Sequence, residues 1–151
     1  MYLWPVAILV LLVDQLSKWW VVTTLVSGES LSLPGGFLFL TLVHNRGAAF
    51  GILQGKSNVF IVCAVLVVAG LILYSAFYHI SRQAQLLTGL LVGGALGNFI
   101  DRIRLGYVID FLDLRWWPVF NLADVAIVCG GILLALYFFR EERDKSDHAS
   151  S

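Results

Sequence analysis

The sequence predicts an all-α integral membrane protein with four transmembrane helices and a small β-rich extracytoplasmic element. Composition is the first reason: the 151 residues are 59% hydrophobic and only 13% charged, whereas a soluble domain carries about 25% charged residues. The second reason is that the apolar residues gather in four long runs. A helix of roughly 20 apolar residues crosses the hydrocarbon core of a bilayer, so each run can span a membrane, the third only with its polar end included.

The four predicted spans contain few charges. They cover residues 3–26, 59–78, 84–102 and 119–139. The first contains Asp14 and Lys18 but has no basic start and no small-residue cleavage site after it, so we interpret it as a span and not as a cleaved signal peptide. Residues 1–140 are predicted to form one membrane-embedded domain, with a polar cytoplasmic tail at 141–151.

An even number of spans places both termini on the same side of the membrane, but the charge distribution does not decide which side. Four basic residues lie on the side of the termini and five on the other: Arg82, Arg140, Arg143 and Lys145 against Arg46, Lys56, Arg102, Arg104 and Arg115. The basic tail that directly follows the fourth span favours cytoplasmic termini.

The two long connections, residues 27–58 and 101–119, are then predicted to lie on the extracytoplasmic side of the membrane and to hold most of the polar chemistry. In the first, GGFLFLTLVHN has the aromatic and β-branched composition of a strand or small sheet. In the second, Trp116 and Trp117 are predicted to lie at the membrane interface.

Several chemistries find no support in the sequence. The formal net charge is zero and the basic residues form no stripe, so nucleic acid is not an expected partner. No HExxH, GxSxG or phosphate-binding glycine loop is present. Cys63 and Cys129 lie inside apolar runs without metal-ligand spacing, and they are predicted to be buried thiols. We therefore expect neither a metal nor another cofactor.

Polar residues inside the first and third spans share helix faces. Asp14 and Lys18 are four residues apart, and a structural ion pair between them is the favoured interpretation. Glycines repeat every four residues in the third span and predict close helix packing: Gly89, Gly93 and Gly97. Asn98 and Arg102 follow on that face, where the arginine could either extend to lipid headgroups or donate to a substrate carbonyl.

Four aspartates fall near the same end of the spans, and they divide into two classes. Asp101 and Asp113 have arginines close in sequence, which predicts solvated surface roles. Asp110 and Asp124 have no basic residue nearby, so burial should raise the pKa of Asp110. If the two carboxyl groups face each other they would share one proton, which gives one base to deprotonate water and one acid to protonate a carbonyl.

Asp124 also has a structural interpretation. Asn121 could cap the fourth helix with Asp124 at its third position, in a pattern close to a capping box, and this role is compatible with catalysis. Two other classes of function remain open at this point: a small proton-coupled membrane transporter, since intramembrane carboxylates relay protons, and a structural scaffold.

Long motifs over nearly the whole chain resemble the lipoprotein signal peptidase (signal peptidase II) family. They are GGALGNFIDRIRLGYVIDF, FNLADVAI, HNRGAAFG and the D-Q-x-x-K of the first span. The resemblance implies an aspartyl protease with four spans and cytoplasmic termini in the bacterial cytoplasmic (inner) membrane, with its active site near the extracytoplasmic face. Its expected partners are membrane lipids and prolipoproteins, which it would cut just before a diacylglyceryl-modified cysteine. A monomer is expected.

The same resemblance assigns the site residues. The aspartates of VIDF and NLAD, Asp110 and Asp124, correspond to the catalytic pair. The expected supporting residues are Asn45, Gly47, Asn98, Arg102, Asn121, Asp14 and Lys18. The loop DLRWWPV between the two aspartate motifs is short, which leaves substrate preference and the movement of that loop open.

Overall fold

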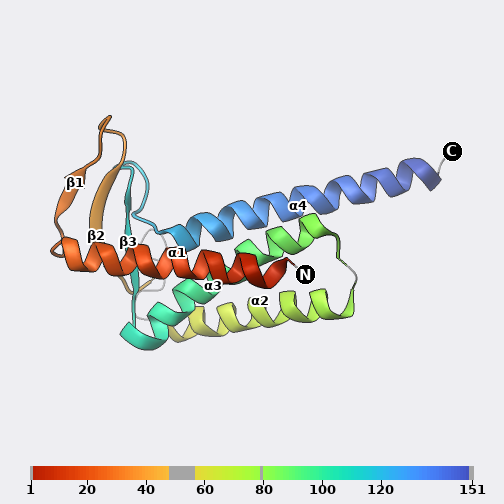
Figure 1. Cartoon of the computed structure of the whole chain (residues 1–151), viewed down its shortest axis with the longest axis horizontal. Coiled ribbons are helices and arrows are strands. Elements are labelled where there is room, and N and C mark those ends of the chain that lie inside the picture. Colours follow the sequence, from red (N-terminus) through yellow and green to blue (C-terminus); the bar gives the residue numbers. More distant parts are fainter. Residues whose placement is uncertain (1, 48–56, 79, 150–151) are drawn as a thin grey trace.

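Four helices and three short strands make up the part of the chain that the computed structural model describes, residues 2–47, 57–78 and 80–149 (Figure 1). In chain order they are α1 (Leu3–Thr24), β1 (Ser30–Ser32), β2 (Phe39–Asn45), α2 (Ser57–Phe77), α3 (Arg82–Leu105), β3 (Val108–Asp113) and α4 (Leu122–Ala149). All four helices are long and apolar enough to cross a membrane. The predicted fold class is therefore confirmed.

The helix ends follow from local chemistry. Ser81 begins α3 by accepting a hydrogen bond from the backbone N–H of Ala84, and Gly106 ends it in the left-handed conformation, with φ of 79°. The third helix thereby gains residues at both ends compared with the predicted span of 84–102. Helix α4 runs on to Ala149, so most of the predicted polar tail is helical.

Helix α3 lies at the centre and packs against the other three helices. The first residues of α1 and the last residues of α4 lie at the end of the helices that faces away from the sheet (Figure 1). The close contact with α1 depends on glycine, as the spacing of the small residues predicts: a Cβ atom built on Gly93 would lie 2.6 Å from the carbonyl oxygen of Ala7. No side chain larger than hydrogen fits such a contact without a shift of the helices.

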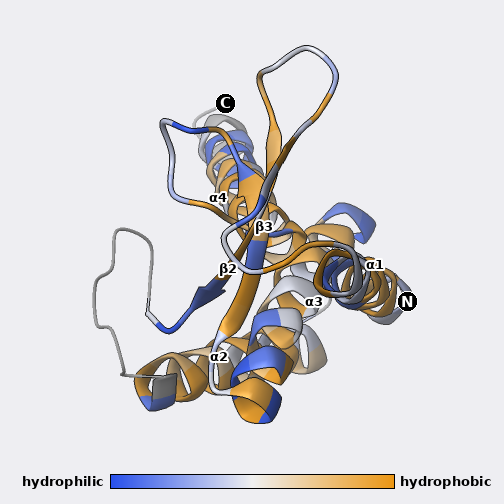
Figure 2. Ribbon diagram, turned by 90° about the vertical axis from the view of Figure 1, so that its left-hand side faces the viewer, coloured by the Kyte–Doolittle hydropathy of each residue, from blue (hydrophilic) through white to orange (hydrophobic). Residues whose placement is uncertain are grey.

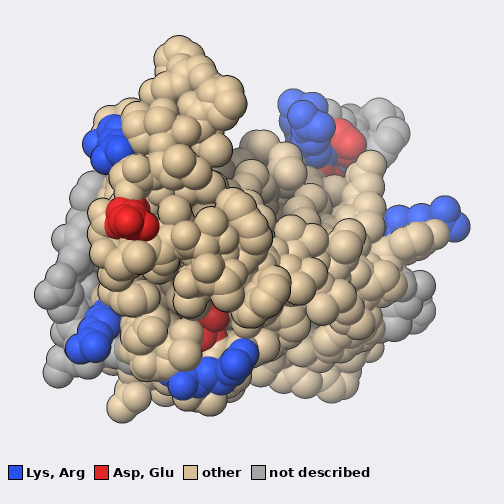
Figure 3. Space-filling view, turned by 60° about the vertical axis from the view of Figure 1, so that its left-hand side comes forward, with Lys and Arg blue, Asp and Glu red and all other residues tan. Residues whose placement is uncertain are grey.

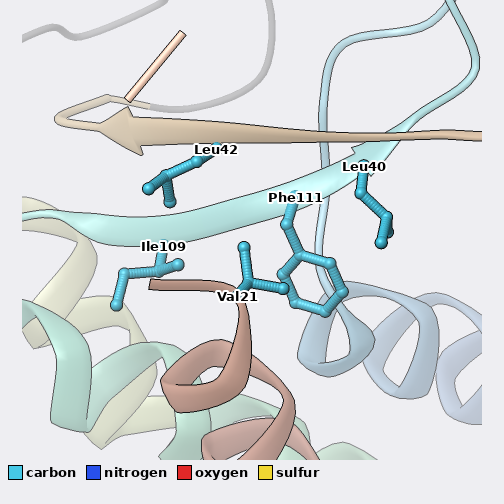
Figure 4. Packing of buried hydrophobic residues seen from close by; sticks show 5 residues of the cluster. All are labelled: Val21, Leu40, Leu42, Ile109 and Phe111. Carbon is cyan, nitrogen blue, oxygen red and sulfur yellow. The ribbon is translucent and has the colours of Figure 1, made fainter. Parts of the chain in front are cut away.

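The three strands form an antiparallel sheet in the order β1-β2-β3. Strand β2 is the strand predicted in the first long connection, whereas β3 lies in the second, where no strand is predicted. The sheet packs on the end of α1 through a buried apolar cluster of Val21, Leu40, Leu42, Ile109 and Phe111 (Figure 4). This cluster fixes the position of β3 relative to the helices.

Large apolar side chains are exposed on all four helices, as expected for contact with lipid. The ribbons of α1 and α2 are largely hydrophobic in Figure 2. Most of the face shown in Figure 3 carries no charged side chain. Cys63 and Cys129 are exposed free thiols on this apolar surface, so the prediction that they are buried is wrong. In a membrane protein, an apolar environment in the sequence does not distinguish a helix face toward lipid from one toward protein.

Candidate active site

Strand β3 and the start of α4 bring Asp110 and Asp124 into one site at the sheet end of the bundle. Asp110 lies opposite Val43 of β2 in the sheet, and its side chain is buried. Asp124 lies in the first turn of α4. A β-bridge between Leu112 and Phe120 folds the chain back directly before this helix, and so the short loop returns Asp124 toward the strand.

Asn121 contacts both aspartates. Its side-chain nitrogen donates a hydrogen bond of 2.6 Å to Oδ1 of Asp110. Its side-chain oxygen accepts from the backbone N–H of Asp124 at 2.9 Å, while Oδ2 of Asp124 accepts from the backbone N–H of Asn121 at 3.2 Å. The expected capping arrangement is therefore present, and the capping side chain also reaches the second aspartate.

Two further asparagines donate to the carboxyl oxygens that Asn121 does not bind, one on each aspartate. Asn45 donates its side-chain amide to Oδ2 of Asp110 at 2.8 Å, and its own oxygen accepts from the backbone N–H of Gly47 at 2.9 Å. Asn98 donates to Oδ1 of Asp124 at 2.7 Å. Each carboxyl group is thus fixed by neutral amide donors, which orient a carboxylate without pairing it with a full positive charge.

The electrostatic environment favours a proton on the pair. Burial raises the pKa of Asp110 to about 7, and the nearby carboxylate of Asp124 adds to the rise, while the hydrogen bonds from Asn45 and Asn121 act in the opposite direction. A carboxyl group with such a pKa can carry a proton near neutral pH, which agrees with the expectation for Asp110. Among the described residues, no three His, Cys, Asp or Glu side chains are grouped to hold a metal ion.

Arg102 turns its guanidinium toward this site. One nitrogen donates to the carbonyl oxygen of Asn98 at 3.4 Å and another to that of Gly47 at 3.5 Å. The group also lies over the ring of Phe60, with 4.9 Å from Cζ to the ring centroid. These contacts place the arginine between α3, α2 and the residues that follow β2. The rest of the HNRGAAFG motif, from residue 48 onward, lies outside the described residues.

The predicted solvated roles of Asp101 and Asp113 are wrong, because both side chains are buried. Asp101 forms an ion pair of 2.8 Å with Lys18, far away in sequence, despite its arginine neighbours. Asp113 does meet Arg115, with 3.5 Å between the charged groups, but it also accepts a 2.7 Å hydrogen bond from the hydroxyl of Thr41 within the sheet. The arginines close in sequence therefore did not predict the ion-pair partner of Asp101.

The ion pair predicted between Asp14 and Lys18 is present, at 2.8 Å, and both side chains are buried. The pair is part of a larger polar cluster that the sequence did not predict. Gln15 donates to Oδ1 of Asp101 at 3.0 Å and to the carbonyl oxygen of Gly97 at 3.3 Å. The one available signal was the position of Asp101 three residues after Asn98, on the same face of the third span.

An apolar groove of about 390 Å³ lies beside the start of α4, and Asp124 is one of its lining residues. Its other lining residues are Leu114, Trp116, Trp117, Phe120, Val125, Val128 and Cys129. The groove thus joins the loop between β3 and α4 to the lipid-facing side of the helix. An extended or helical apolar segment lying in it would pass next to the aspartate.

Comparison with known proteins identifies the family. A model of the family described as signal peptidase (SPase) II matches residues 6–140. The lipoprotein signal peptidase of Syntrophomonas wolfei is 52% identical over 148 residues, which cover 95% of this chain and 99% of the relative. That of Halothermothrix orenii is 49% identical over 138 residues, 91% of this chain and 95% of the relative.

A solved structure described as a bacterial membrane enzyme, determined by the in meso method at 2.3 Å resolution, superposes with a TM-score of 0.88. It is 34% identical in sequence, and the match covers 93% of this chain and 89% of that one. Because the family model covers most of the chain and both relatives are about half identical over nearly their whole length, this chain belongs to the signal peptidase II family.

Proposed function

We propose that this protein is an intramembrane aspartyl endopeptidase that removes the signal peptide from prolipoproteins. It hydrolyses the bond just before a diacylglyceryl-modified cysteine, with Asp110 and Asp124 as the catalytic pair. The family supports a peptidase that acts on lipoprotein precursors. The aspartyl mechanism and the position of the cut are the parts that go beyond the family name.

One observation carries the mechanism: the side chain of Asn121 is hydrogen-bonded to Asp110 and to the backbone of Asp124 at the same time. An asparagine that only capped a helix would not need a 2.6 Å hydrogen bond to a second buried carboxyl group. Oδ1 of Asp110 is thus fixed by the side chain of Asn121, and Oδ2 of Asp124 is fixed by the backbone N–H of the same residue. This arrangement preorganises the pair for a reaction that uses both carboxyl groups.

The reaction then needs only water and the shared proton. The ionised carboxylate removes a proton from a water molecule, whose oxygen attacks the scissile carbonyl carbon, while the protonated carboxyl group donates its proton to the carbonyl oxygen. The tetrahedral intermediate collapses when the C–N bond breaks and the nitrogen of the cysteine takes a proton from the first aspartate. The second aspartate recovers its proton from the intermediate, which restores the starting state.

The membrane sets where the bond is cut. We place both termini in the cytoplasm and the site near the extracytoplasmic face, with the lipid of the substrate cysteine held in the outer leaflet. The apolar part of the signal peptide would enter beside α3 and α4, and the groove that Asp124 helps to line has the apolar surface that such a segment requires. Asn45 and Arg102 would hold backbone groups of the substrate from the sheet side.

The test is cleavage in detergent by the purified wild type, Asp110→Asn and Asp124→Asn. Each is incubated with a prolipoprotein that does or does not carry diacylglycerol on its cysteine. We expect lipid-dependent cleavage by the wild type and a loss of at least about 10³-fold in both variants, because each removes one partner of the acid–base pair. Asp144→Asn, on the exposed end of α4, is the matched control and should cleave normally.

The outcomes separate the parts of the proposal. Full cleavage by Asp124→Asn would leave that residue with its capping role alone. Lipid-independent cleavage by the wild type would remove the substrate assignment but not the mechanism. An inactive wild type that carries out substrate-dependent proton movement in vesicles would replace the peptidase with a transporter.

A further inference from the structure

Behind the two aspartates, the ammonium group of Lys18 forms the centre of a buried polar cluster. It lies 2.8 Å from Oδ2 of Asp14 and 2.8 Å from Oδ2 of Asp101, and its side chain is only 2% exposed. Its third contact is a 3.1 Å hydrogen bond to the side-chain oxygen of Asn98. All three donors of the ammonium group are thus in use, on groups from α1 and α3.

Each carboxylate of this cluster also holds the backbone immediately before one of the proposed catalytic residues. Oδ2 of Asp101 accepts from the backbone N–H of Ile109 at 3.2 Å, and Ile109 precedes Asp110. Oδ1 of Asp14 accepts from the backbone N–H of Ala123 at 2.9 Å, and Ala123 precedes the second aspartate. One lysine therefore links the two chain segments that carry the reacting groups.

The third contact of Lys18 determines how Asn98 is oriented. An ammonium group only donates hydrogen bonds, so the atom of Asn98 beside it must be the amide oxygen. The NH2 group of Asn98 then faces the other way, and it donates to Asp124 at 2.7 Å. The same amide oxygen accepts a 3.1 Å hydrogen bond from Asn121, which in turn holds Asp110.

We propose that Lys18 is a positioning residue that, together with Asp14 and Asp101, sets the separation and orientation of the two catalytic aspartates. This inference rests on the proposed function, because it assigns a role in the same reaction. It differs from a purely structural ion pair within α1, which would support folding but leave the turnover of folded enzyme unchanged.

Removing the lysine alone would strand two buried carboxylates and destabilise the protein strongly. The test therefore uses two matched triple variants in which the cluster is neutral. Both contain Asp14→Asn and Asp101→Asn; one adds Lys18→Met and the other Lys18→Gln. Methionine and glutamine have similar size, but only glutamine can donate a hydrogen bond to Asn98.

For each folded enzyme, kcat, KM for a lipid-modified prolipoprotein and Tm in detergent are measured. We expect kcat of the methionine variant to be about 100-fold below wild type, because a shift of a catalytic group by about 1 Å lowers the rate by about that factor. Its KM should stay within about threefold of wild type. The kcat of the glutamine variant should be at least about tenfold higher than that of the methionine variant. Equal kcat in the two variants, or wild-type kcat in the methionine variant at any Tm, would overturn the inference.

A second pair keeps the inference testable if the triple variants do not fold. Asp101→Leu removes the acceptor for the backbone N–H of Ile109 but leaves the ion pair of Lys18 and Asp14, whose net charge is zero. Asp101→Asn keeps a side-chain oxygen that can accept from the same N–H. We expect a loss in kcat of at least about tenfold with leucine and of less than about threefold with asparagine, since only leucine frees the backbone before the strand aspartate. Equal kcat in these two variants would contradict the role of the cluster.

Lys145→Met, on the exposed end of α4, controls for the loss of a lysine and should match wild type in kcat, KM and Tm. Failure of this inference is distinct from failure of the proposed function. Retained cleavage by Asp110→Asn and Asp124→Asn would remove the proposed function itself. Loss of cleavage in those two variants, with unchanged kcat in the variants at position 18, would remove only the positioning role.

Discussion

Asn121 donates its side-chain amide to Oδ1 of Asp110 at 2.6 Å while its side-chain oxygen caps the helix that follows. One residue thus serves stability and the geometry of the site, and its capping role can be separated from its contact with Asp110 by the length of the side chain that replaces it. A serine retains an oxygen at the cap position, but it is too short to reach the strand aspartate.

Replacing Asn121 by serine should reduce kcat by about 100-fold, because Asp110 loses one of its fixed donors, and it should also lower Tm, because the buried amide donates to Asn98 and to the carbonyl oxygen of Ile109 as well. Replacement by alanine should reduce kcat similarly and lower the free energy of unfolding by about 1 kcal/mol more than serine does, through loss of the cap. Tm in detergent and kcat with a lipid-modified prolipoprotein measure the two effects. A serine variant with wild-type kcat would show that the contact to Asp110 has no part in turnover.

The pKa of Asp110, raised to about 7 by burial and by the carboxylate of Asp124, predicts the pH dependence of activity. Turnover requires that the pair hold one proton, and this proton is lost as the pH rises through about 7. We therefore expect kcat/KM to fall on the alkaline side of neutrality, and a series of cleavage rates between pH 5 and about 9 measures it. Tm over the same range controls for unfolding; a flat profile in stable enzyme would be inconsistent with this assignment.

The sequence was sufficient to predict the four spans, because each depends on the composition of a long apolar run and not on a particular contact. It was not sufficient for β3. That strand is buried along nearly its whole length, between β2 and the helix ends, so VIDFLD shows no alternation of polar and apolar residues. Short apolar runs of this kind do not distinguish a buried strand from other structure.

The candidate pair was also predictable, because Asp110 and Asp124 lack any local counterion. The same reasoning failed for Asp101, whose partner Lys18 comes from another helix although arginines are its neighbours in the chain. A carboxylate at the end of a helix can pair with any cation that packing brings near, and sequence distance carries no information on that packing. The cluster around Lys18 therefore became visible only in three dimensions.

Stability should also depend on pH through Asp110. The pKa of this group is about 7 in the folded protein and 3.8 in its unperturbed state, so the folded state binds the proton more tightly. The stabilisation is fully present below pH 3.8 and is lost as the pH rises to about 7. The expected slope is up to about 1 kcal/mol per pH unit.

The measurement is Tm in detergent between pH 4 and about 7 for the wild type and Asp110→Asn, in which position 110 no longer titrates. We expect the decline of Tm with rising pH to be smaller in the variant, whatever its absolute Tm, because asparagine also alters the hydrogen bond with Asn45. Identical slopes in the two proteins would rule out Asp110 as the titrating group.

Gly93 allows α1 and α3 to approach closely, and Gly93→Ala should lower the free energy of unfolding by about 1–3 kcal/mol, as overpacking does in other proteins. The added Cβ would lie 2.6 Å from the carbonyl oxygen of Ala7 and 2.8 Å from Cβ of Val10. Gly70 of α2 is the matched control, because a Cβ there meets no heavy atom within 4 Å. Tm in detergent should fall for Gly93→Ala only; equal Tm values would contradict the proposed contact.

The apolar groove beside Asp124 predicts a variant that affects substrate binding and not chemistry. Cys129 lines this groove and is exposed, and it lies five residues after Asp124, off the i+4 position directly beside that carboxyl group. Cys129→Trp would therefore fill part of the groove volume of about 390 Å³. We expect KM for a lipid-modified prolipoprotein to rise about tenfold, with kcat within about threefold of wild type, because the loss is in binding that the ground state and transition state share. Leu9→Trp places the same side chain on the exposed face of α1 and should leave KM unchanged. If KM rises equally in both variants, the added tryptophan itself is the cause. That result would exclude the groove as the binding site of the signal peptide.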